Sequence, residues 1–381
     1  MTSQTEPFYK KLSLNLISLA LLGAALYIGQ GILVPLFFAI LLATLLLPVT
    51  NFLQRIRFPK VPAIILAIFI SLALIAGIIY LLSTQVANFL EDSDAIKTRL
   101  NSLIHSLQGW INTTFHISTG KQNQYLKDTA ENMKDSGAGI VGQTVVNITE
   151  ALSYVVFLPV YTFLLLFYKD LIKRFIVSVF ESTKEENVNE ILHESRTIGQ
   201  HYILGLLMDM TLVFALNSVG FLILGIKYPI FLALVGALLN LVPYIGMLVA
   251  NVFCMLITLI TSENLSDVVW VAVILAIVQF IDNNFMMPLI VGNRVRINAL
   301  VTIVGVIIGG ALCGISGMFL AIPGIAVLKV IFDRVESLKP WGMLLGDDTD
   351  NKESKIVAAV TGKTPKTPKA AKPSVPKASK D

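Results

Sequence analysis

The chain of 381 residues is 55% hydrophobic and only 14% charged. Apolar runs of about 18 or more residues recur along most of its length, which a soluble domain does not need and a membrane span does. This excludes an ordinary soluble protein and predicts an all-α, polytopic helical membrane protein. The formal net charge of +4 comes from lysines near the C-terminus, so the charge does not indicate a nucleic-acid surface.

Eight hydrophobic blocks follow one another along the chain. They cover residues 12–29, 31–49, 61–83, 148–168, 201–226, 228–260, 268–291 and 300–332. The first block follows Lys10 and Lys11 as a signal peptide would, but no small-residue cleavage site precedes the second block. We therefore interpret the first block as a retained helix.

The blocks at 228–260 and 300–332 are each too long for one span and too short for two, because a span needs about 20 helical residues. Both are interrupted in the middle. Pro243 and Gly246 break the first, and four glycines break the second, where helix propensity is lost. These glycines are Gly309, Gly310, Gly314 and Gly317.

Charged residues predict the topology. Basic residues are enriched in cytoplasmic loops, and they follow the second and fourth blocks: Arg55, Arg57, Lys60, Lys169, Lys173 and Arg174. The later loops fit this rule if 228–260 is a re-entrant hairpin entering from outside and 300–332 is one entering from the cytoplasm. We predict six full spans plus these two hairpins, with both termini cytoplasmic, in the inner (plasma) membrane. Eight full crossings are the alternative.

The chain divides into four regions. Residues 1–83 form N-terminal membrane helices, 84–147 a small extracytoplasmic helical insertion, 148–346 the transport core, and 347–381 a disordered cytoplasmic tail rich in lysine and proline. The insertion carries a helical seam that suits either a helical hairpin or a short coiled coil. The tail could also bind anionic lipid head groups.

The core contains an amphipathic cytoplasmic loop at 169–200. Apolar side chains at Leu171, Phe175 and Val179 share one face, opposite Lys173 and Arg174. This pattern predicts a helix on the membrane surface, with membrane lipids as partners.

Polar residues inside the seventh block are the main candidates for a transport site. A carboxylate or carboxamide at bilayer depth costs several kcal/mol unless it faces a partner, an ion or water. Gln279, Asp282 and Asn283 share one helical face. The candidates for a substrate or ion pathway are Asp282, Gln279, Asn283, Asn284, Asp209, Asn240, Pro243, Gly246, Gly310 and Gly314.

These candidates have structural alternatives. Asp209 or Asp282 could simply hydrogen-bond a neighbouring helix, and the Gly-x-x-x-Gly spacings from Gly305 to Gly314 could serve close helix packing. A buried carboxylate would suit a site that alternates between a protonated and an ion-bound form.

An enzyme is not expected. The four histidines are scattered, and no HExxH, GxSxG or nucleotide-loop pattern occurs, which also argues against ATP-driven pumping. Cys254 and Cys313 lie in apolar blocks without metal-ligand spacing. We expect no cofactor or metal, although coupling to protons or sodium ions would be compatible with the carboxylates. A passive channel stays open as an alternative.

Four ordered motifs resemble a known family. They are PLFFAILLATLLLP at 35–48, LGIKYP at 224–229 leading to LVPYIG at 241–246, the polar segment 279–292, and the glycine-rich segment ending in AIP at 321–323. Their order resembles the autoinducer-2 exporter family, also called the PerM-like permeases, over residues 8–334. Family members often have prolines where this chain has Met247 and Asn251, and the lysine-rich tail lies outside the shared region.

The resemblance implies a multi-spanning permease of the inner membrane that forms a homo-oligomer. Members are linked to export of a quorum-sensing signal and to sodium/proton antiport. The leading hypothesis is therefore a secondary transporter exporting a small polar solute. The alternatives are a sodium/proton antiporter and a non-transporting membrane scaffold that uses the insertion as its interaction surface.

Overall fold

The computed structural model describes residues 8–124, 155–179, 185–242, 245–286 and 297–346. Within these ranges the regular structure is helical, apart from one isolated bridge between Ile297 and Gly346. The all-α prediction is confirmed for this part of the chain.

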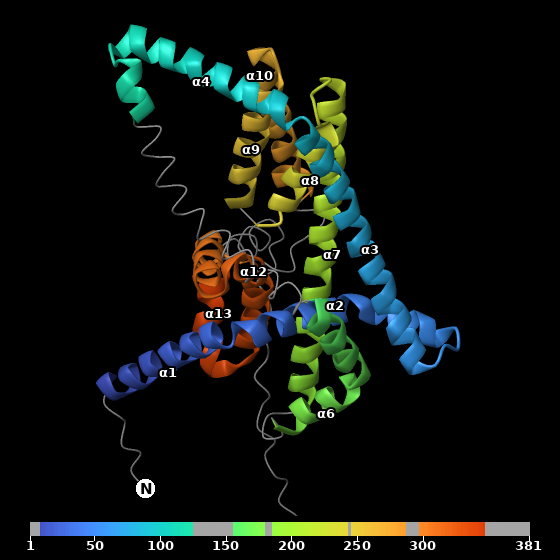
Figure 1. Ribbon diagram of the computed structural model, residues 1–381. Coiled ribbons are helices and arrows are strands. Elements are labelled where there is room, and N and C mark those ends of the chain that lie inside the picture. The colour runs from blue at the N-terminus through green and yellow to red at the C-terminus, as the bar shows by residue number, and fades with distance from the viewer. Residues whose placement is uncertain (1–7, 125–154, 180–184, 243–244, 287–296, 347–381) are drawn as a thin grey trace, which may run out of the picture.

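The helices follow the hydrophobic blocks. Those labelled in Figure 1 are α1 (Phe8–Ile28), α2 (Gln30–Arg55), α3 (Lys60–Glu91), α4 (Ser93–Phe115), α6 (Lys169–Val179), α7 (Glu185–Ile223), α8 (Pro229–Leu239), α9 (Ile245–Thr261), α10 (Leu265–Ile281), α12 (Ala299–Arg334) and α13 (Lys339–Leu345). A further helix spans Val155–Phe167. A π-helical turn, η1 (Asp282–Met286), continues α10, and a 3-10 turn, η3 (Glu336–Leu338), precedes α13.

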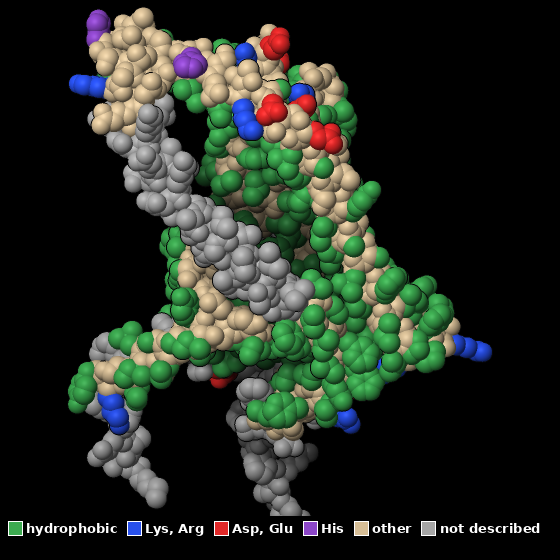
Figure 2. Space-filling view, in the orientation of Figure 1, with side chains coloured by type: hydrophobic (Ala, Val, Ile, Leu, Met, Phe, Trp, Pro, Cys, Tyr) green, Lys and Arg blue, Asp and Glu red, His purple; other side chains and the backbone are tan. Residues whose placement is uncertain are grey.

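Five of the described helices are long and apolar enough to cross a membrane, or six if Val155–Phe167 and α6 form one bent span. The longest, α7, has 39 residues and a length of about 58 Å, against about 30 Å of hydrocarbon. It therefore reaches well beyond the bilayer. Large apolar side chains are exposed along most of these helices, and Figure 2 shows them over the middle of the molecule, with charged side chains gathered toward its two ends. An apolar surface of this extent suits lipid.

The first two helices do not turn back on each other, as two antiparallel spans would. Only Gly29 separates them, and its amide donates to the Ala25 carbonyl at 2.9 Å while its carbonyl accepts from the Leu33 amide at 2.9 Å. Figure 1 shows α1 and α2 running nearly end to end across the lower half of α7. The first two blocks are therefore joined by backbone hydrogen bonds across Gly29. A glycine costs a helix only about 1 kcal/mol, too little to end it.

The helix α6 leaves the apolar helix before it at a sharp angle. Val155–Phe167 and α6 are bent by 68° at their junction. The apolar face of α6 is uncovered, with Leu171, Phe175 and Val179 each more than half exposed. This geometry agrees with the prediction of a helix that rests on a membrane surface.

The insertion begins with α4 and then reverses. His116 ends α4 in the left-handed conformation, and Gln108 on α4 donates to the Asn123 side chain at 2.8 Å. This reversal is how a helical hairpin starts. Leu107 and Trp110 of the predicted seam are exposed, and residues 125–147, which would complete the insertion, lie outside the described ranges.

The helices α8 and α9 form a hairpin. The Cys254 thiol of α9 donates to the Leu232 carbonyl of α8, and Gly246 packs against the Leu239 carbonyl, where any side chain would collide. Gly225 and Tyr228 both have positive φ and turn the chain from α7 into α8. The turn residues Pro243 and Tyr244 lie outside the described ranges.

Both ends of this hairpin lie beside α4. Before it, Lys227 Nζ lies 2.9 Å from Asp92 Oδ2 at the junction of α3 and α4, and this hydrogen bond lowers the pKa of Asp92. After it, Arg99 on α4 donates to the carbonyls of Ser262 and Glu263 at 3.3 Å. We call this side of the molecule the α4 end. The chain thus enters and leaves the α8–α9 hairpin at the same end.

The helix α12 is a second hairpin. Cys313 and Gly314 are not helical, and Gly314 has φ 59° and ψ −146°, a conformation open essentially only to glycine. The chain folds back there, because Gly309 contacts the Gly317 backbone and a Cβ on Gly309 would lie 3.2 Å from the Cβ of Ala321. The expected break in block 300–332 is confirmed at Gly314.

Both ends of the α12 hairpin lie at the opposite end of the molecule, which we call the α6 end. The Asn298 amide, just before α12, donates to the Leu345 carbonyl of α13 at 3.0 Å. After the hairpin, Arg334 contacts the first turns of α7. The two hairpins therefore begin and end at opposite ends of the molecule; that they re-enter a membrane from opposite sides stays a prediction.

Cysteine labelling should reproduce this geometry in a membrane. With Cys254 and Cys313 replaced, we expect Lys227→Cys and Ser262→Cys to react with an impermeant thiol reagent from the same side, because one hairpin separates them. Ser178→Cys, exposed on α6, should react only from the other side. Labelling of Lys227→Cys and Ser262→Cys from opposite sides would mean that α8 and α9 together make one crossing.

Candidate functional site

Asp282 lies where the regular α-helix gives way to a π-helical turn. The helix α10 ends at Ile281, and η1 continues from Asp282 to Met286. Such turns are rare and frequently occur at functional sites. The side chain of Asp282 is buried, with 4% of its surface exposed.

A second buried carboxyl group meets Asp282. Asp209 of α7 is 6% exposed, and its carboxyl group is close enough to that of Asp282 for the two to interact electrostatically. The Oδ1 atom of each residue has no partner among the described residues. Two neighbouring carboxylates buried in an apolar environment cannot both be charged unless a cation lies between them, so one of them otherwise holds a proton. The pair can thus hold one proton or one cation.

Gln279 orients the pair from one turn earlier on α10. Its Nε2 donates to Asp282 Oδ2 at 3.2 Å and to Asn283 Oδ1 at 3.1 Å. The predicted shared face of these three residues is confirmed. Because Gln279 uses its amide hydrogens on Oδ2 and Asn283, Oδ1 of Asp282 stays free for Asp209, a proton or a cation.

The surroundings of the pair are apolar. One buried cluster consists of Val213, Ala237, Val278 and Met286, from α7, α8, α10 and η1, and Val213 and Val278 each lie one helical turn from a carboxyl residue of the pair. A low-dielectric environment strengthens interactions between charges. A change in the charge of the carboxyl pair would therefore act strongly on these three helices and η1.

Asp209 sits between the two hairpins along α7. Above it, Phe221 packs against Phe231 and Leu232 of α8. Below it, Ile198 packs against Ala326 and Val330 of α12, about 16 Å from Asp209 along the helix. Figure 1 shows α8 and α9 beside the upper half of α7 and α12 beside its lower half.

The remaining predicted residues are placed elsewhere. Asn284 is exposed and donates to the Phe280 carbonyl of its own helix. Asn240 ends α8 and is half-buried. Gly246 permits the α8–α9 contact, Gly310 lies against Met318, and Gly314 makes the α12 turn. Pro243 lies outside the described ranges.

Two further polar residues on α7 were not among the predicted site residues. Asn217 and Ser218 are buried, and neither Asn217 Oδ1 nor Ser218 Oγ has a partner among the described residues. They lie about two turns beyond Asp209, toward the α4 end. An asparagine in an apolar run could have been identified from the sequence as a candidate site residue, because a carboxamide is costly to bury in a membrane. A serine could not have been identified in this way, because its hydroxyl group commonly hydrogen-bonds the backbone of its own helix.

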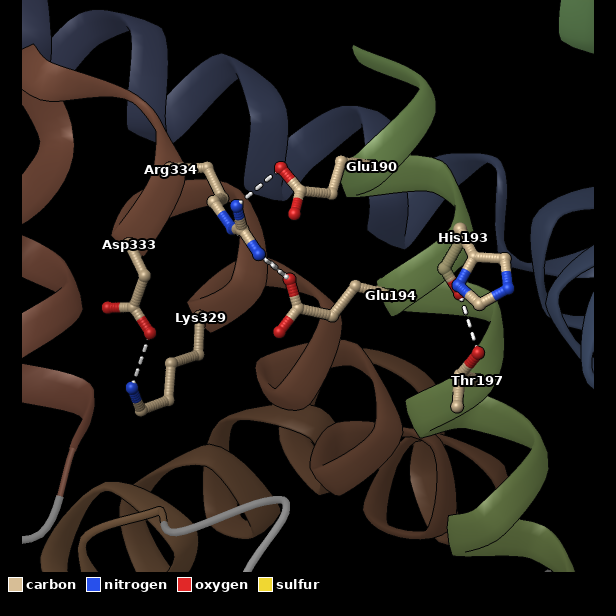
Figure 3. A network of polar contacts seen from close by, with 7 residues as sticks. All are labelled: Glu190, His193, Glu194, Thr197, Lys329, Asp333 and Arg334. Atoms are coloured by element: carbon tan, nitrogen blue, oxygen red, sulfur yellow. Dashed lines mark hydrogen bonds and ion pairs between the residues drawn. The ribbon is translucent and has the colours of Figure 1, made fainter. Parts of the chain in front are cut away.

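A cluster of ion pairs joins the end of α12 to the start of α7 (Figure 3). Arg334 Nη1 lies 2.7 Å from Glu190 Oε2, and Arg334 Nη2 lies 2.8 Å from Glu194 Oε2. All three side chains are more than one-third exposed, so solvent screening keeps each pair weak. The cluster fixes which turn of α7 the hairpin meets.

We expect Arg334→Gln to lower the free energy of unfolding by no more than about 1 kcal/mol. Combined with Glu194→Gln in a double-mutant cycle, it should show a coupling energy of a few tenths of a kcal/mol, measured by denaturant unfolding in detergent. Arg174→Gln, an exposed arginine on α6, serves as the control and should not couple to Glu194. Equal effects of the two arginine variants would contradict the contact.

Helices of membrane length, an apolar outer surface and a buried carboxyl pair between opposed hairpins define a polytopic membrane transport protein. The chain matches the model of the AI-2E family of transporters over residues 16–337. This protein belongs to the AI-2E transporter family.

Relatives of similar length support this assignment. The chain is 26% identical to YrrI of Bacillus subtilis (strain 168), covering 79% of this chain and 86% of YrrI. It is 25% identical to YueF of the same organism, covering 80% and 85% of the two chains, and 26% identical to PerM of Escherichia coli (strain K12), covering 80% and 88%. Their names designate candidate transport proteins and a candidate permease, and state no substrate.

Proposed function

We propose that this protein is a secondary transporter, not an enzyme, that exports a small polar solute across the inner membrane and couples this to movement of a proton or sodium ion. The observation that carries the proposal is the burial of two neighbouring carboxyl groups, Asp209 and Asp282, where α7 packs against α10 and η1. A site that holds one proton or one cation is what ion coupling requires.

The arrangement of the hairpins supports alternating access. Two elements that enter from opposite ends and pack on one central helix resemble the inverted elements around which secondary transporters build their sites. Movement of either hairpin along α7 would change access to Asp209 from one end. The phenyl groups at Phe221 and Phe231, and the contact of Ile198 with Ala326, are the packing surfaces on which such movement would occur.

The orientation follows from the basic residues. Arg55, Arg57 and Lys60, between α2 and α3, and Lys169 and Lys173 on α6 lie at the α6 end. By the enrichment of lysine and arginine in cytoplasmic loops, we assign the α6 end to the cytoplasm and the α4 end to the outside. The solute would then leave toward α4. We further expect assembly as a homo-oligomer.

Sodium/proton antiport is the second candidate. The carboxyl pair alone could exchange one ion for the other, without a second solute. Flux assays in proteoliposomes would separate the candidates. An exporter should move the test solute, autoinducer-2, faster under an imposed proton or sodium gradient. An antiporter should move protons in response to sodium without the solute, and a scaffold should move neither.

A further inference from the structure

A cavity of about 490 Å³ lies at the α6 end, away from the carboxyl pair. Four elements surround it: α2 contributes residues from Ile40 to Asn51, the Val155–Phe167 helix contributes Leu165 and Leu166, and α6 and α7 complete the wall. The sharp bend between Val155–Phe167 and α6 opens this space, because α6 turns away instead of continuing along α2.

The polar part of the wall is positive. Lys169, Lys173 and Arg196 line the cavity, with Asp170 as the acidic residue of the lining. The Asp170 carboxylate lies 3.7 Å from Lys60 Nζ, so its charge is balanced from outside the cavity. Lys169 donates to the neutral Asn51 side chain at 3.1 Å and so keeps its full charge. The cavity is therefore complementary to an anion.

The acidic and basic side chains near the start of α7 lie on different faces of the helix, so the glutamates do not neutralise the positive charge of the cavity wall. Glu190 and Glu194 point to Arg334 on α12, whereas His193 projects from another side of the helix (Figure 3). His193 and Arg196 belong to the cavity wall. Glu190 and Glu194 of α7 thus form ion pairs with α12 and not with the basic residues of the cavity.

The rest of the wall is largely apolar. Ile40, Leu47 and Leu166 line the inner part. The neighbouring outer face of α6, with Leu171 and Phe175, is exposed and suits the boundary between head groups and acyl chains. A ligand that fills the cavity must combine an anionic head with an apolar body.

We propose that this cavity binds an anionic glycerophospholipid, with its phosphate held by Lys169, Lys173 and Arg196 and the start of its acyl chains against Ile40, Leu47 and Leu166. Charge-assisted hydrogen bonds from lysine and arginine are the interactions that phosphate groups favour, and basic pockets between membrane helices on the cytoplasmic side bind such head groups. The inference does not depend on the ion-coupling proposal.

The test is native mass spectrometry of the full chain in mixed micelles that contain phosphatidylglycerol and phosphatidylcholine. We expect the wild type to retain phosphatidylglycerol in preference to phosphatidylcholine. Lys173→Gln with Arg196→Gln should lower its occupancy at least about fivefold, because two charge-assisted hydrogen bonds to the phosphate are lost. Arg55→Gln with Arg174→Gln removes the same charge near the same end and outside the cavity wall, and should retain wild-type occupancy.

Three results would overturn the proposal. They are equal retention of the two lipids by the wild type, equal loss in both double variants, and displacement of the lipid by inorganic phosphate or glycerol 3-phosphate at the concentration of the lipid. The last result would assign the cavity to a soluble phosphate. If the cavity variant does not fold, a phosphatidylglycerol with a photoreactive acyl chain can be crosslinked to the wild type. Labelling should then map to α2, the Val155–Phe167 helix or α6 beside the cavity, and labelling confined to other helices would contradict the proposal.

Discussion

Asp282→Asn should reduce ion-coupled transport by at least about 30-fold and leave the fold intact. The substitution keeps the shape and the hydrogen bond from Gln279 but removes the charge that holds a cation. A lost interaction of 2 to 3 kcal/mol corresponds to a factor of about 30 to 150. The measurement is gradient-driven flux in proteoliposomes, normalised to the amount of inserted protein.

Asp209→Asn should have the same effect, and the double variant should be no worse than either single variant, because the two groups act as one unit. The matched control is Asn284→Asp. It adds a carboxyl group on the same π-helical turn, at an exposed position that bonds its own backbone, and should leave the flux nearly unchanged. Wild-type flux in Asp282→Asn, or full additivity in the double variant, would argue against a shared ion site.

Gly309→Ala should destabilise the protein by about 2 to 3 kcal/mol. The two arms of the α12 hairpin meet at Gly309 and Gly317, and an added Cβ would overlap the Gly317 carbonyl oxygen. Backbone cannot move aside as a flexible side chain can, so the arms must separate. Thermal and denaturant unfolding of the purified protein in detergent would measure the loss.

Gly324→Ala is the control for this prediction. Gly324 lies on the same hairpin, and a Cβ there meets nothing within 4 Å. The change should be neutral or slightly stabilising, since alanine favours a helix by up to about 1 kcal/mol over glycine. If both variants lost equal stability, glycine would be needed along this hairpin for a reason other than the close approach of its arms.

Two local features of the sequence predicted the chain reversals in these blocks: the length of each block and the helix-breaking residues in its middle. Block length showed that 300–332 could not be one span, and the glycines marked where it could turn. Gly314 does turn, with a backbone conformation that glycine alone adopts readily. At Gly29 the helical hydrogen bonds continue instead, because one glycine lowers helix propensity without removing a hydrogen bond. Whether a glycine turns or continues a helix depends on what packs beside it, and sequence spacing does not give that.

The carboxyl pair was predicted only as two separate candidates. Apolar surroundings marked both Asp209 and Asp282, which lie more than 70 residues apart in the chain. Their contact depends on the rotation of α7 against α10 and on the change to a π-helical turn at Asp282. The i, i+3 and i+4 spacing correctly gave the face shared by Gln279, Asp282 and Asn283.

Infrared difference spectroscopy of the reconstituted protein tests most directly whether the Asp209–Asp282 pair exchanges a proton for a cation. We predict a protonated carboxyl band in the wild type at neutral pH that is absent from the Asp209→Asn, Asp282→Asn double variant. Raising the pH or adding sodium ions should remove this band and release one proton per chain. The absence of such a band, or its persistence at both high pH and high sodium, would contradict an ion-coupling role for the pair.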